Sequence, residues 1–324
     1  MRYRRLGRTG LDVSEIGYGA WGIGGMMWVG AEDQESLRAL HRAIDLGVNF
    51  IDTALVYGDG HSEKLVGEVV RYRSEPIYVA TKVPPKNMLW PARPGISIDQ
   101  VFPYWHILQA TEESLRHLRL ERVDLQQLHV WSPEFTASEE WRRAVEDLKK
   151  SGKVRYFGIS ANDYQPASLL DALRTGLIDC VQVIYNIYDP RAADALFPLC
   201  QQLGVGVIAR VPLDEGGLTG RITPETTFPN GDFRNRYFRG ERRRQVWEHA
   251  RKLQQAVGEA HGTLAQVALR FCLSHPAVST VIPGMRSVPN VESSCAVPDM
   301  GPLPADILEE LRRHIWIRDF YSAA

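Results

Sequence analysis

Residues 49–82 read NFIDTALVYGDGHSEKLVGEVVRYRSEPIYVATK, and they contain one complete unit of the pattern that decides the fold. Two short apolar runs, residues 49–53 and 77–82, flank a segment at residues 62–70 with the apolar spacing of a helix. The runs are rich in β-branched and aromatic residues, as expected for strands that are covered on both faces. The stretch therefore predicts a strand, a covering helix and a second, parallel strand.

The same alternation recurs along the chain after a predicted hairpin, residues 3–6 and 11–14 around the turn GRTG at 7–10. The predicted strands are residues 15–20, 49–53, 77–82, 123–128, 155–160, 180–185, 205–209 and 278–282. The predicted helices are residues 33–46, 62–70, 104–118, 138–151, 165–174, 191–203, 263–274 and 304–317. Eight such units predict an α/β fold with one (β/α)8 TIM barrel, residues 1–324 forming a single domain. An open doubly wound sheet is the alternative, but the glycines at 17, 19 and 22 lack its usual phosphate-binding spacing.

Two predicted connections are unusually long: residues 83–102 after the third strand, and residues 211–239 after the seventh. Both follow the carboxyl ends of strands, where barrel active sites form, and long loops of this kind are often functional. The first carries the aromatic residues Trp90 and Phe102, and Tyr104 and Trp105 follow closely after it. They could line an apolar pocket or pack the loop onto the barrel, and both interpretations stay open.

Composition excludes several classes of protein. Hydrophobic residues make up 44% and charged residues 24%, which is typical of a globular chain, and the net charge of −1 gives no general attraction to nucleic acid or membranes. The basic run at 234–244 is interpreted as a solvated helix start with Glu241 and Glu248 as partners. The chain has no apolar run of membrane-spanning or signal-peptide length, so a cytoplasmic protein is expected. Its four cysteines lack metal-ligand spacing, and no metal is predicted.

Four polar residues fall where three consecutive predicted strands end. Asp52 and Lys82 lie at the ends of the strands at 49–53 and 77–82, and His129 directly follows the strand at 123–128. Tyr57 lies five residues beyond Asp52. The ends of neighbouring strands converge at the mouth of a closed barrel, so these side chains are expected to meet there.

Together these residue types suit proton transfer to a carbonyl group. A buried Lys82 needs a counter-charge, and Asp52 is the nearest candidate. The lysine charge would lower the Tyr57 pKa from about 10, making the phenol a general acid, and His129 would give the carbonyl oxygen a second hydrogen bond. Singly, each residue also has a structural explanation: a helix cap, ordinary packing, a surface lysine or a core histidine. Their joint placement favours hydride transfer to an aldehyde or ketone.

The chain resembles the aldo-keto reductases from the hairpin to the last helix. The matching motifs are GYGAW at 17–21, FIDTA at 50–54 with Tyr57 beyond it, TKV at 81–83, DLQQLH at 124–129, GKVRYFGIS at 152–160, QVIYN at 182–186, PLDEGGLTG at 212–220 and IPG at 282–284. The resemblance implies a tetrad in which Tyr57 is the acid, Lys82 and Asp52 tune it, and His129 orients the carbonyl. It also implies NADPH as hydride donor, with NADH possible, and a small carbonyl or sugar-like substrate.

Further positions match the family's cofactor contacts: Gly19, Ala20, Trp21, Asp52, Ser160, Asn162, Gln182, Arg210, Pro212, Leu213, Gly216, Leu218, Gly220, Arg221, Gly284, Arg286, Asn290 and Ser294. The resemblance implies that Ser160 and Gln182 contact the nicotinamide carboxamide and that Trp21 also faces the substrate. Arg286 is the candidate for an adenosine 2′-phosphate, with a solvated loop arginine as the alternative.

This sequence departs from the family pattern in three places. Ala161 separates Ser160 from Asn162, which displaces the expected amide donor by one residue, and Ser293-Ser294 replaces the usual Glu-Asn near the adenine. Arg210 stands where an aromatic residue normally stacks on the nicotinamide. We hypothesise that its charge disfavours the cationic oxidised ring. The alternative is that Arg210 turns away to an acid such as Asp214 or Glu215.

Three other functions remain compatible with the sequence. One is a cofactor-sensing regulatory subunit with slow residual reductase activity, like the β-subunits of voltage-gated potassium channels, which resemble this family. Another is a sugar dehydrogenase that works in the oxidative direction, because hydride transfer is reversible. The third is a barrel lyase or isomerase that uses no nicotinamide. The sequence leaves the oligomeric state open.

Overall fold

The computed structural model describes residues 1–321, so residues 322–324, with which the predicted domain ends, lie outside the described part. Its main sheet has eight parallel strands, one for each predicted strand. They are β3 (Tyr18–Gly19), β4 (Phe50–Asp52), β5 (Tyr78–Val83), β6 (Val123–Leu128), β7 (Val154–Ser160), β8 (Cys180–Ile184), β9 (Gly206–Arg210) and β10 (Val278–Val281). The sheet is the predicted (β/α)8 barrel, and the strand predicted at 15–20 is the one that is much shorter than expected.

The barrel closes between its first and last strands. Each strand from β3 to β10 pairs with the next in chain order, and single parallel bridges join Ile16 to Val281 and Gly19 to Gly284. The backbone of Gly17 donates to Val281 and that of Gly19 to Pro283, at 2.8 and 3.0 Å. Closure brings the carboxyl ends of all eight strands to one mouth.

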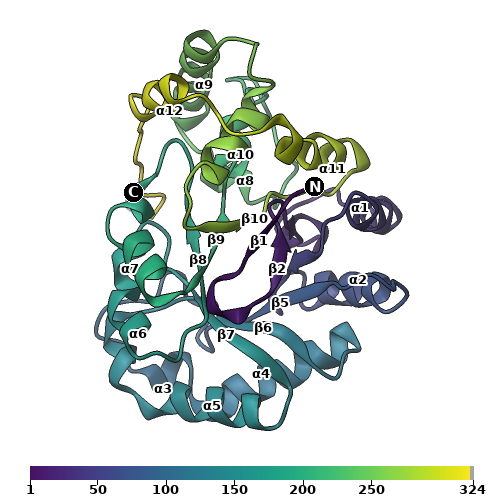
Figure 1. Cartoon of the computed structure of the whole chain (residues 1–324), viewed down its shortest axis with the longest axis vertical. Helices are drawn as coiled ribbons and strands as arrows, with labels where there is room; N and C mark the ends of the chain where they lie inside the picture. Colours follow the sequence, from purple (N-terminus) through teal and green to yellow (C-terminus); the bar gives the residue numbers. More distant parts are fainter. Residues whose placement is uncertain (322–324) are drawn as a thin grey trace.

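Helices surround the strands (Figure 1). Those that match predicted segments are α1 (Asp33–Asp45), α2 (His61–Val70), α4 (Tyr104–Leu118), α5 (Glu139–Lys150), α6 (Leu170–Arg174), α7 (Leu196–Leu203), α10 (Leu264–Leu273) and α12 (Ala305–Arg312). Their starts follow local chemistry: Ser138 caps α5, and Thr263 forms a capping box with Gln266 at α10. Helix α12 ends before the predicted residue 317, because Trp316 leaves the helix and stacks on His249.

Four helices were not predicted as elements: α3 (Ile98–Val101), α8 (Arg234–Tyr237), α9 (Arg242–Val257) and α11 (Val288–Cys295). Helix α9 contains the second half of the basic run. As expected for a solvated helix start, Arg244 pairs with Glu241 and Glu248 at 2.7 and 2.9 Å. No helix within residues 1–321 combines the length and the apolar character that crossing a membrane requires.

A hairpin of β1 (Tyr3–Arg5) and β2 (Asp12–Ser14) seals the amino-terminal end of the barrel. Figure 1 shows it crossing the centre of the ring of strands. Its apolar side chains join residues from the strand interiors in one buried cluster, made of Leu6, Leu11, Val13, Phe50, Ala80, Leu125, Cys180, Ile208 and Ile282. Arg4 fixes the hairpin by donating to the backbone oxygens of Leu273 and Val278, at 2.8 and 3.0 Å. The opposite end, where the strands terminate, is thus the end left for a site.

Both long connections lie at that end, and their aromatic residues divide between the two open interpretations. Trp90 lines a cavity beside His129, with ring centroids 5.7 Å apart. Phe102 is instead fully buried and packs against Phe135, and Trp105 is 52% exposed. The loop therefore both packs onto the barrel and contributes one ring to a pocket wall.

Gly67 allows α2 and α4 to approach each other closely. A Cβ at this position would lie 2.2 Å from the backbone oxygen of Leu118. Replacement of a helix glycine by alanine normally stabilises a helix by about 1 kcal/mol, but overpacking against a backbone costs about 1–3 kcal/mol. Because the obstacle is a backbone oxygen that cannot rotate away, the cost should lie in the upper part of that range, about 2–3 kcal/mol. We therefore expect Gly67→Ala to lower the free energy of unfolding by about 1–2 kcal/mol in a urea titration. Glu68→Ala, an exposed change in the same helix, is the control, and a Gly67→Ala protein as stable as the wild type would contradict the prediction.

Candidate active site

A fully buried lysine lies at the mouth of the barrel. Lys82 on β5 is 0% exposed, and its Nζ donates to Asp52 Oδ1 at 2.5 Å, to the backbone oxygen of Thr53 at 2.8 Å and to the Tyr57 hydroxyl at 3.2 Å. The three hydrogen bonds use all three protons of the ammonium group. The expected meeting of Lys82, Asp52 and Tyr57 therefore occurs, although Lys82 comes from the βα unit after the one that carries Asp52 and Tyr57.

Two glutamines complete the environment of the carboxylate. Asp52 Oδ2 accepts hydrogen bonds from Gln182 Nε2 at 2.7 Å and from Gln127 Nε2 at 3.2 Å. Both glutamines are buried. A buried ion pair is stable only when its remaining polar atoms are satisfied, and here the barrel interior supplies the partners. Gln127 was not predicted from the sequence. It lies directly opposite Lys82 in the neighbouring strand, and this register is the signal from which it could have been predicted.

The turn after β4 holds Tyr57 against Trp21. The two rings lie 6.1 Å apart with 29° between their planes. The close approach depends on Gly58, whose φ is +66° and where a Cβ would lie 1.9 Å from the backbone oxygen of Gly24. The loop that carries Trp21 thus contacts the Tyr57 turn backbone to backbone, which fixes the phenol beside the indole.

The direction of the Tyr57 pKa corrects the expectation from sequence. Burial raises the Tyr57 pKa above its ordinary value, and the nearby Lys82 charge opposes this rise without cancelling it. The expected lowering was wrong, because the sequence indicates the neighbouring charge but not the loss of water around the phenol. Burial alone would lower the Lys82 pKa, but Asp52 and Tyr57 together raise it, so the ammonium stays charged.

His129 lies between two aromatic rings at the same mouth. Its ring contacts Tyr57 and Trp90 edge to face, with centroids 5.8 and 5.7 Å away. Burial, followed by the Lys82 and Arg210 charges, lowers the His129 pKa well below its ordinary value, so the imidazole is neutral at pH 7. Its Nδ1 is buried and has no partner among the described residues. The ring is therefore not held as a core histidine by protein hydrogen bonds.

These residues border a cavity of about 1600 Å³ at the carboxyl ends of the strands. This exceeds the ~300–1000 Å³ of a site for one drug-sized ligand, leaving room for an elongated ligand and a second small one. The predicted residues that line it are Gly19, Ala20, Trp21, Asp52, Tyr57, His129, Ser160, Asn162, Gln182, Arg210, Pro212, Leu213, Gly216, Arg221, Gly284, Arg286, Asn290 and Ser294. Lys82 lies behind this wall. Leu218 and Gly220 also lie outside it, because Leu218 packs in the core and Gly220 ends a turn against Gln254.

The lining of the cavity includes several cationic groups. Arg221, Arg251 and Arg286 line it together with amides and hydroxyls from α9, α10 and α11. Arg286 is partly buried and donates to the backbone oxygen of Val29 at 3.2 Å, so it is not a freely solvated loop arginine. Guanidinium groups in a cavity wall fit the phosphates of a dinucleotide. Arg251 and its neighbour Gln254 were missed, because the helix that carries them was not predicted.

Ser160, Gln182 and Asn162, the three candidates for contacting the nicotinamide carboxamide, differ in which of their polar atoms lack a protein partner. The Ser160 hydroxyl and Gln182 Oε1 have no hydrogen-bond partner within residues 1–321. Asn162, in contrast, uses its Oδ1 for the backbone N–H groups of Ala92 and Trp131, at 3.1 and 3.2 Å, and its Nδ2 for Ala92 and Gln165. Its amide ties the Trp90 loop to the barrel and has little capacity left for a ligand.

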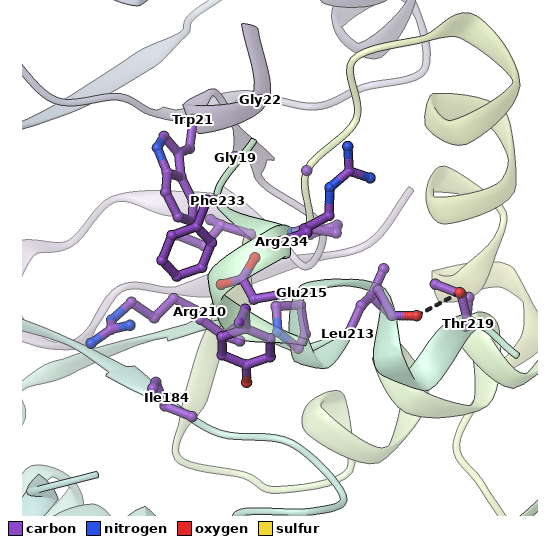
Figure 2. Close-up of a pocket in the computed structure, with 18 of the residues that line it drawn as sticks. Gly19, Trp21, Gly22, Ile184, Arg210, Leu213, Glu215, Thr219, Phe233 and Arg234 are labelled. Carbon is purple, nitrogen blue, oxygen red and sulfur yellow. Dashed lines mark hydrogen bonds between the residues drawn. The ribbon is translucent and has the colours of Figure 1, made fainter. Parts of the chain in front are cut away.

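Arg210 pairs with an acid, but with neither of the two considered from sequence. Its Nη2 donates to Asp163 Oδ1 at 2.5 Å and to the backbone oxygen of Ala161 at 3.0 Å, and Figure 2 shows the side chain extended along the pocket. Asp163 also accepts from the Tyr321 hydroxyl at 2.8 Å. The partner was missed because it follows the fifth strand of the barrel, more than 40 residues before Arg210. The Arg210 charge is therefore compensated locally.

Further aromatic residues gather around Trp21 in the lining of the cavity. Phe233, from the loop after β9, contacts Trp21 with ring centroids 5.1 Å apart, and Phe320 contacts Phe233 at 5.6 Å. Trp28 packs edge to face on Trp21 at 5.6 Å. The length of the loop after β9 was the sequence signal for Phe233, but nothing in the sequence marked Trp28 or the tail that carries Phe320.

The buried ion pair gives a stability prediction. Lys82→Met removes the cation from Asp52 and should lower the free energy of unfolding by about 3–5 kcal/mol, because an unpaired carboxylate stays buried. Adding Asp52→Asn removes the uncompensated charge and should recover part of the loss. Chemical denaturation of both proteins is the measurement, with Lys64→Met at an exposed position as the control. Equal stability of Lys82→Met and Lys64→Met would contradict the prediction.

Comparison with known proteins agrees with this geometry. The family model described as "Aldo/keto reductase family" matches residues 15–315. The aldo-keto reductase YhdN of Bacillus subtilis is 27% identical over 90% of this chain and 87% of its own. The glycerol dehydrogenase AKR11B4 from Gluconobacter oxydans superposes with a TM-score of 0.78 at 27% identity, over 98% of this chain and 97% of its own.

A third similar protein was solved with a nucleotide. The aldo-keto reductase from Klebsiella pneumoniae in complex with NADPH superposes with a TM-score of 0.71 at 26% identity, over 97% of this chain and 95% of its own. The family model covers most of the chain, and the barrel and hairpin agree with it. This chain belongs to the aldo/keto reductase family of oxidoreductases.

Proposed function

We propose that the protein is an NADPH-dependent reductase that converts an aldehyde or ketone to an alcohol, and that the whole chain acts as one such unit. The same groups can run the reverse oxidation of an alcohol or sugar hydroxyl. One observation carries the proposal: a single ammonium, Lys82 Nζ, contacts both the Asp52 carboxylate and the Tyr57 hydroxyl beside a large cavity. The names of similar proteins, a glycerol dehydrogenase and an NADPH complex, support it.

In this proposal Tyr57 donates its proton to the carbonyl oxygen. Its raised pKa keeps the phenol protonated at pH 7, which is the form that an acid requires. When the proton leaves, the phenolate lies 3.2 Å from Lys82 Nζ, whose charge stabilises it. Neutral His129 gives a second hydrogen bond to the same oxygen, and Asp52 holds Lys82 in place. In the oxidative direction the phenolate accepts the alcohol proton.

The cavity residues would hold NADPH, whose nicotinamide supplies the hydride when it is bound. The free Ser160 hydroxyl and Gln182 Oε1 offer a donor and an acceptor to the carboxamide. Arg221, Arg251 and Arg286 in the cavity wall would bind the phosphates, which favours NADPH over NADH. The serines at 293 and 294 offer no charge to the adenine end, so NADH remains the alternative donor.

The variant Tyr57→Phe tests whether Tyr57 is the general acid. Because the variant retains the ring but not the proton, kcat for carbonyl reduction should fall about 100-fold or more. The decrease in NADPH absorbance with a panel of aldehydes, ketones and sugars measures this rate. NADPH binding, followed by tryptophan fluorescence, should persist. Tyr72→Phe, at a position that is 77% exposed, is the control, and undiminished turnover of Tyr57→Phe would overturn the mechanism.

Asp163 offers a test of the charge at Arg210. The hypothesis from sequence was that Arg210 disfavours the cationic oxidised nicotinamide, but Asp163 compensates that charge. Asp163→Asn should therefore uncover it and raise the Kd for NADP⁺ relative to NADPH by about fivefold, or on the order of 1 kcal/mol. Fluorescence titration with both nucleotides measures the ratio. Asp171→Asn, at an exposed ion pair on α6, is the control, and an unchanged ratio in Asp163→Asn would refute the hypothesis.

A further inference from the structure

Glu215 places a carboxyl group without a protein partner in the cavity. It lines the pocket, and its side chain makes no hydrogen bond or ion pair within residues 1–321. Neighbouring acids differ: Asp163 is held by Arg210 and Tyr321, and Asp214 by Tyr237 and Arg242. Figure 2 shows the Glu215 carboxyl directed into the pocket on the side where Phe233 and Trp21 lie. We expect a partly buried polar group that lines a pocket and has no protein partner to have a ligand as its partner.

The backbone around Glu215 is held in an unfavourable conformation that aims this side chain. Val211, Asp214 and Glu215 have φ values of +54°, +48° and +54°, in the left-handed region that residues with a side chain rarely adopt. Asp214 anchors the turn, because its Oδ1 accepts from the Tyr237 hydroxyl at 2.5 Å and from Arg242 at 3.0 Å. Such strain persists only where surrounding contacts enforce it, and it gathers at functional sites. Here the strained turn directs the Glu215 side chain into the pocket.

The surroundings keep this carboxyl largely neutral. Burial, followed by the charges of Asp214 and Asp163, raises the Glu215 pKa to about 8, and Arg210 and Arg234 act in the opposite direction. The two arginines are weak counter-charges because each is already paired, Arg210 with Asp163 and Arg234 with Asp232 at 2.7 Å. At pH 7 the group therefore offers one hydrogen-bond donor beside acceptor oxygens.

A neighbouring donor and acceptor match two adjacent hydroxyl groups. We propose that Glu215 binds a vicinal diol of the ligand in this cavity, with the Trp21 and Phe233 rings as its apolar platform. The rings lie 5.1 Å apart, and Trp21 also contacts Tyr57, so a diol on Glu215 is close to the reacting carbonyl. The placement of the diol beside the reacting carbonyl rests on the proposed function. Two ligands can supply the diol: a hydroxylated carbonyl substrate or a ribose of the nucleotide.

A matched pair of substrates tests the first source. D-Glyceraldehyde and propanal share the aldehyde and differ by the hydroxyls at C2 and C3. Glu215→Leu should lower kcat/KM for D-glyceraldehyde by about 10- to 100-fold and for propanal by less than about threefold, as expected when a site loses its hydrogen bonds to hydroxyls. Glu215→Gln, which keeps a donor and an acceptor, should retain most of the preference at pH 7. Glu225→Leu, exposed in the same loop, should behave as wild type.

Fluorescence titration with NADPH tests the second source in the same proteins. If a ribose is the diol, Glu215→Leu should raise the NADPH Kd about tenfold and change both substrates equally. If neither the substrate ratio nor the NADPH Kd changes, diol binding by Glu215 is refuted. The proposed function would fail by a different result, namely that none of the carbonyl compounds tested leads to NADPH oxidation by the wild-type protein.

The pH dependence separates a lost carboxyl from a disturbed fold. Since the raised pKa makes ionisation costly in the folded state, the contribution of Glu215 to stability falls between pH 4.5, its ordinary pKa, and about 8. The Tm of Glu215→Gln relative to wild type should therefore rise from pH 5 to pH 8.5. A difference that is constant with pH would show that Glu215 is not the buried, unpaired acid on which the proposal depends.

Discussion

The structure at the mouth of the barrel depends on the buried charge of Lys82. An ammonium group without contact to water is tolerated only if each proton has an acceptor, and here three segments provide one each: β4 through Asp52, the residue after it through Thr53, and the following turn through Tyr57. Asp52 in turn needs the amides of Gln127 and Gln182, from strands on the far side of β5. The proposed catalytic arrangement and a folding requirement are thus the same set of contacts.

Several parts of the pocket wall are held by polar contacts between distant segments. The Trp90 loop is tied down by Asn162, the strained turn after β9 by the contacts of Asp214, and Arg210 by Asp163. Each tie is a polar side chain satisfied by a distant segment, and these ties add to apolar packing such as that of Phe102. Ser160, His129 and Glu215 also line the cavity, but their side chains have no such tie within residues 1–321.

The sequence predicted the elements that depend on local pattern and missed contacts that depend on three-dimensional register. Every barrel strand and two of the three contacts of Lys82, those with Asp52 and Tyr57, followed from apolar runs and their ends, with β6 and α4 placed to the residue. The contact with the backbone oxygen of Thr53 was not predicted. Helix α9 was anticipated only as a solvated start in the basic run, and its buried stripe of Val246, Ala250, Leu253 and Val257 was missed. The rise in the Tyr57 pKa could not be foreseen, because desolvation depends on how completely Trp21 and the barrel cover the ring. The partner of Arg210 was missed because Asp163 is distant in sequence.

The hairpin at the closed end also affects the order in which the protein can fold during synthesis. Arg4 binds backbone groups of Leu273 and Val278, and the first barrel strand completes the cylinder only by pairing with β10. The hairpin therefore leaves the ribosome well before the segment that holds its partners. Until β10 is made, the contacts of Arg4 and one edge of the sheet stay uncompleted. Contacts of such long range slow folding, and exposed sheet edges invite aggregation.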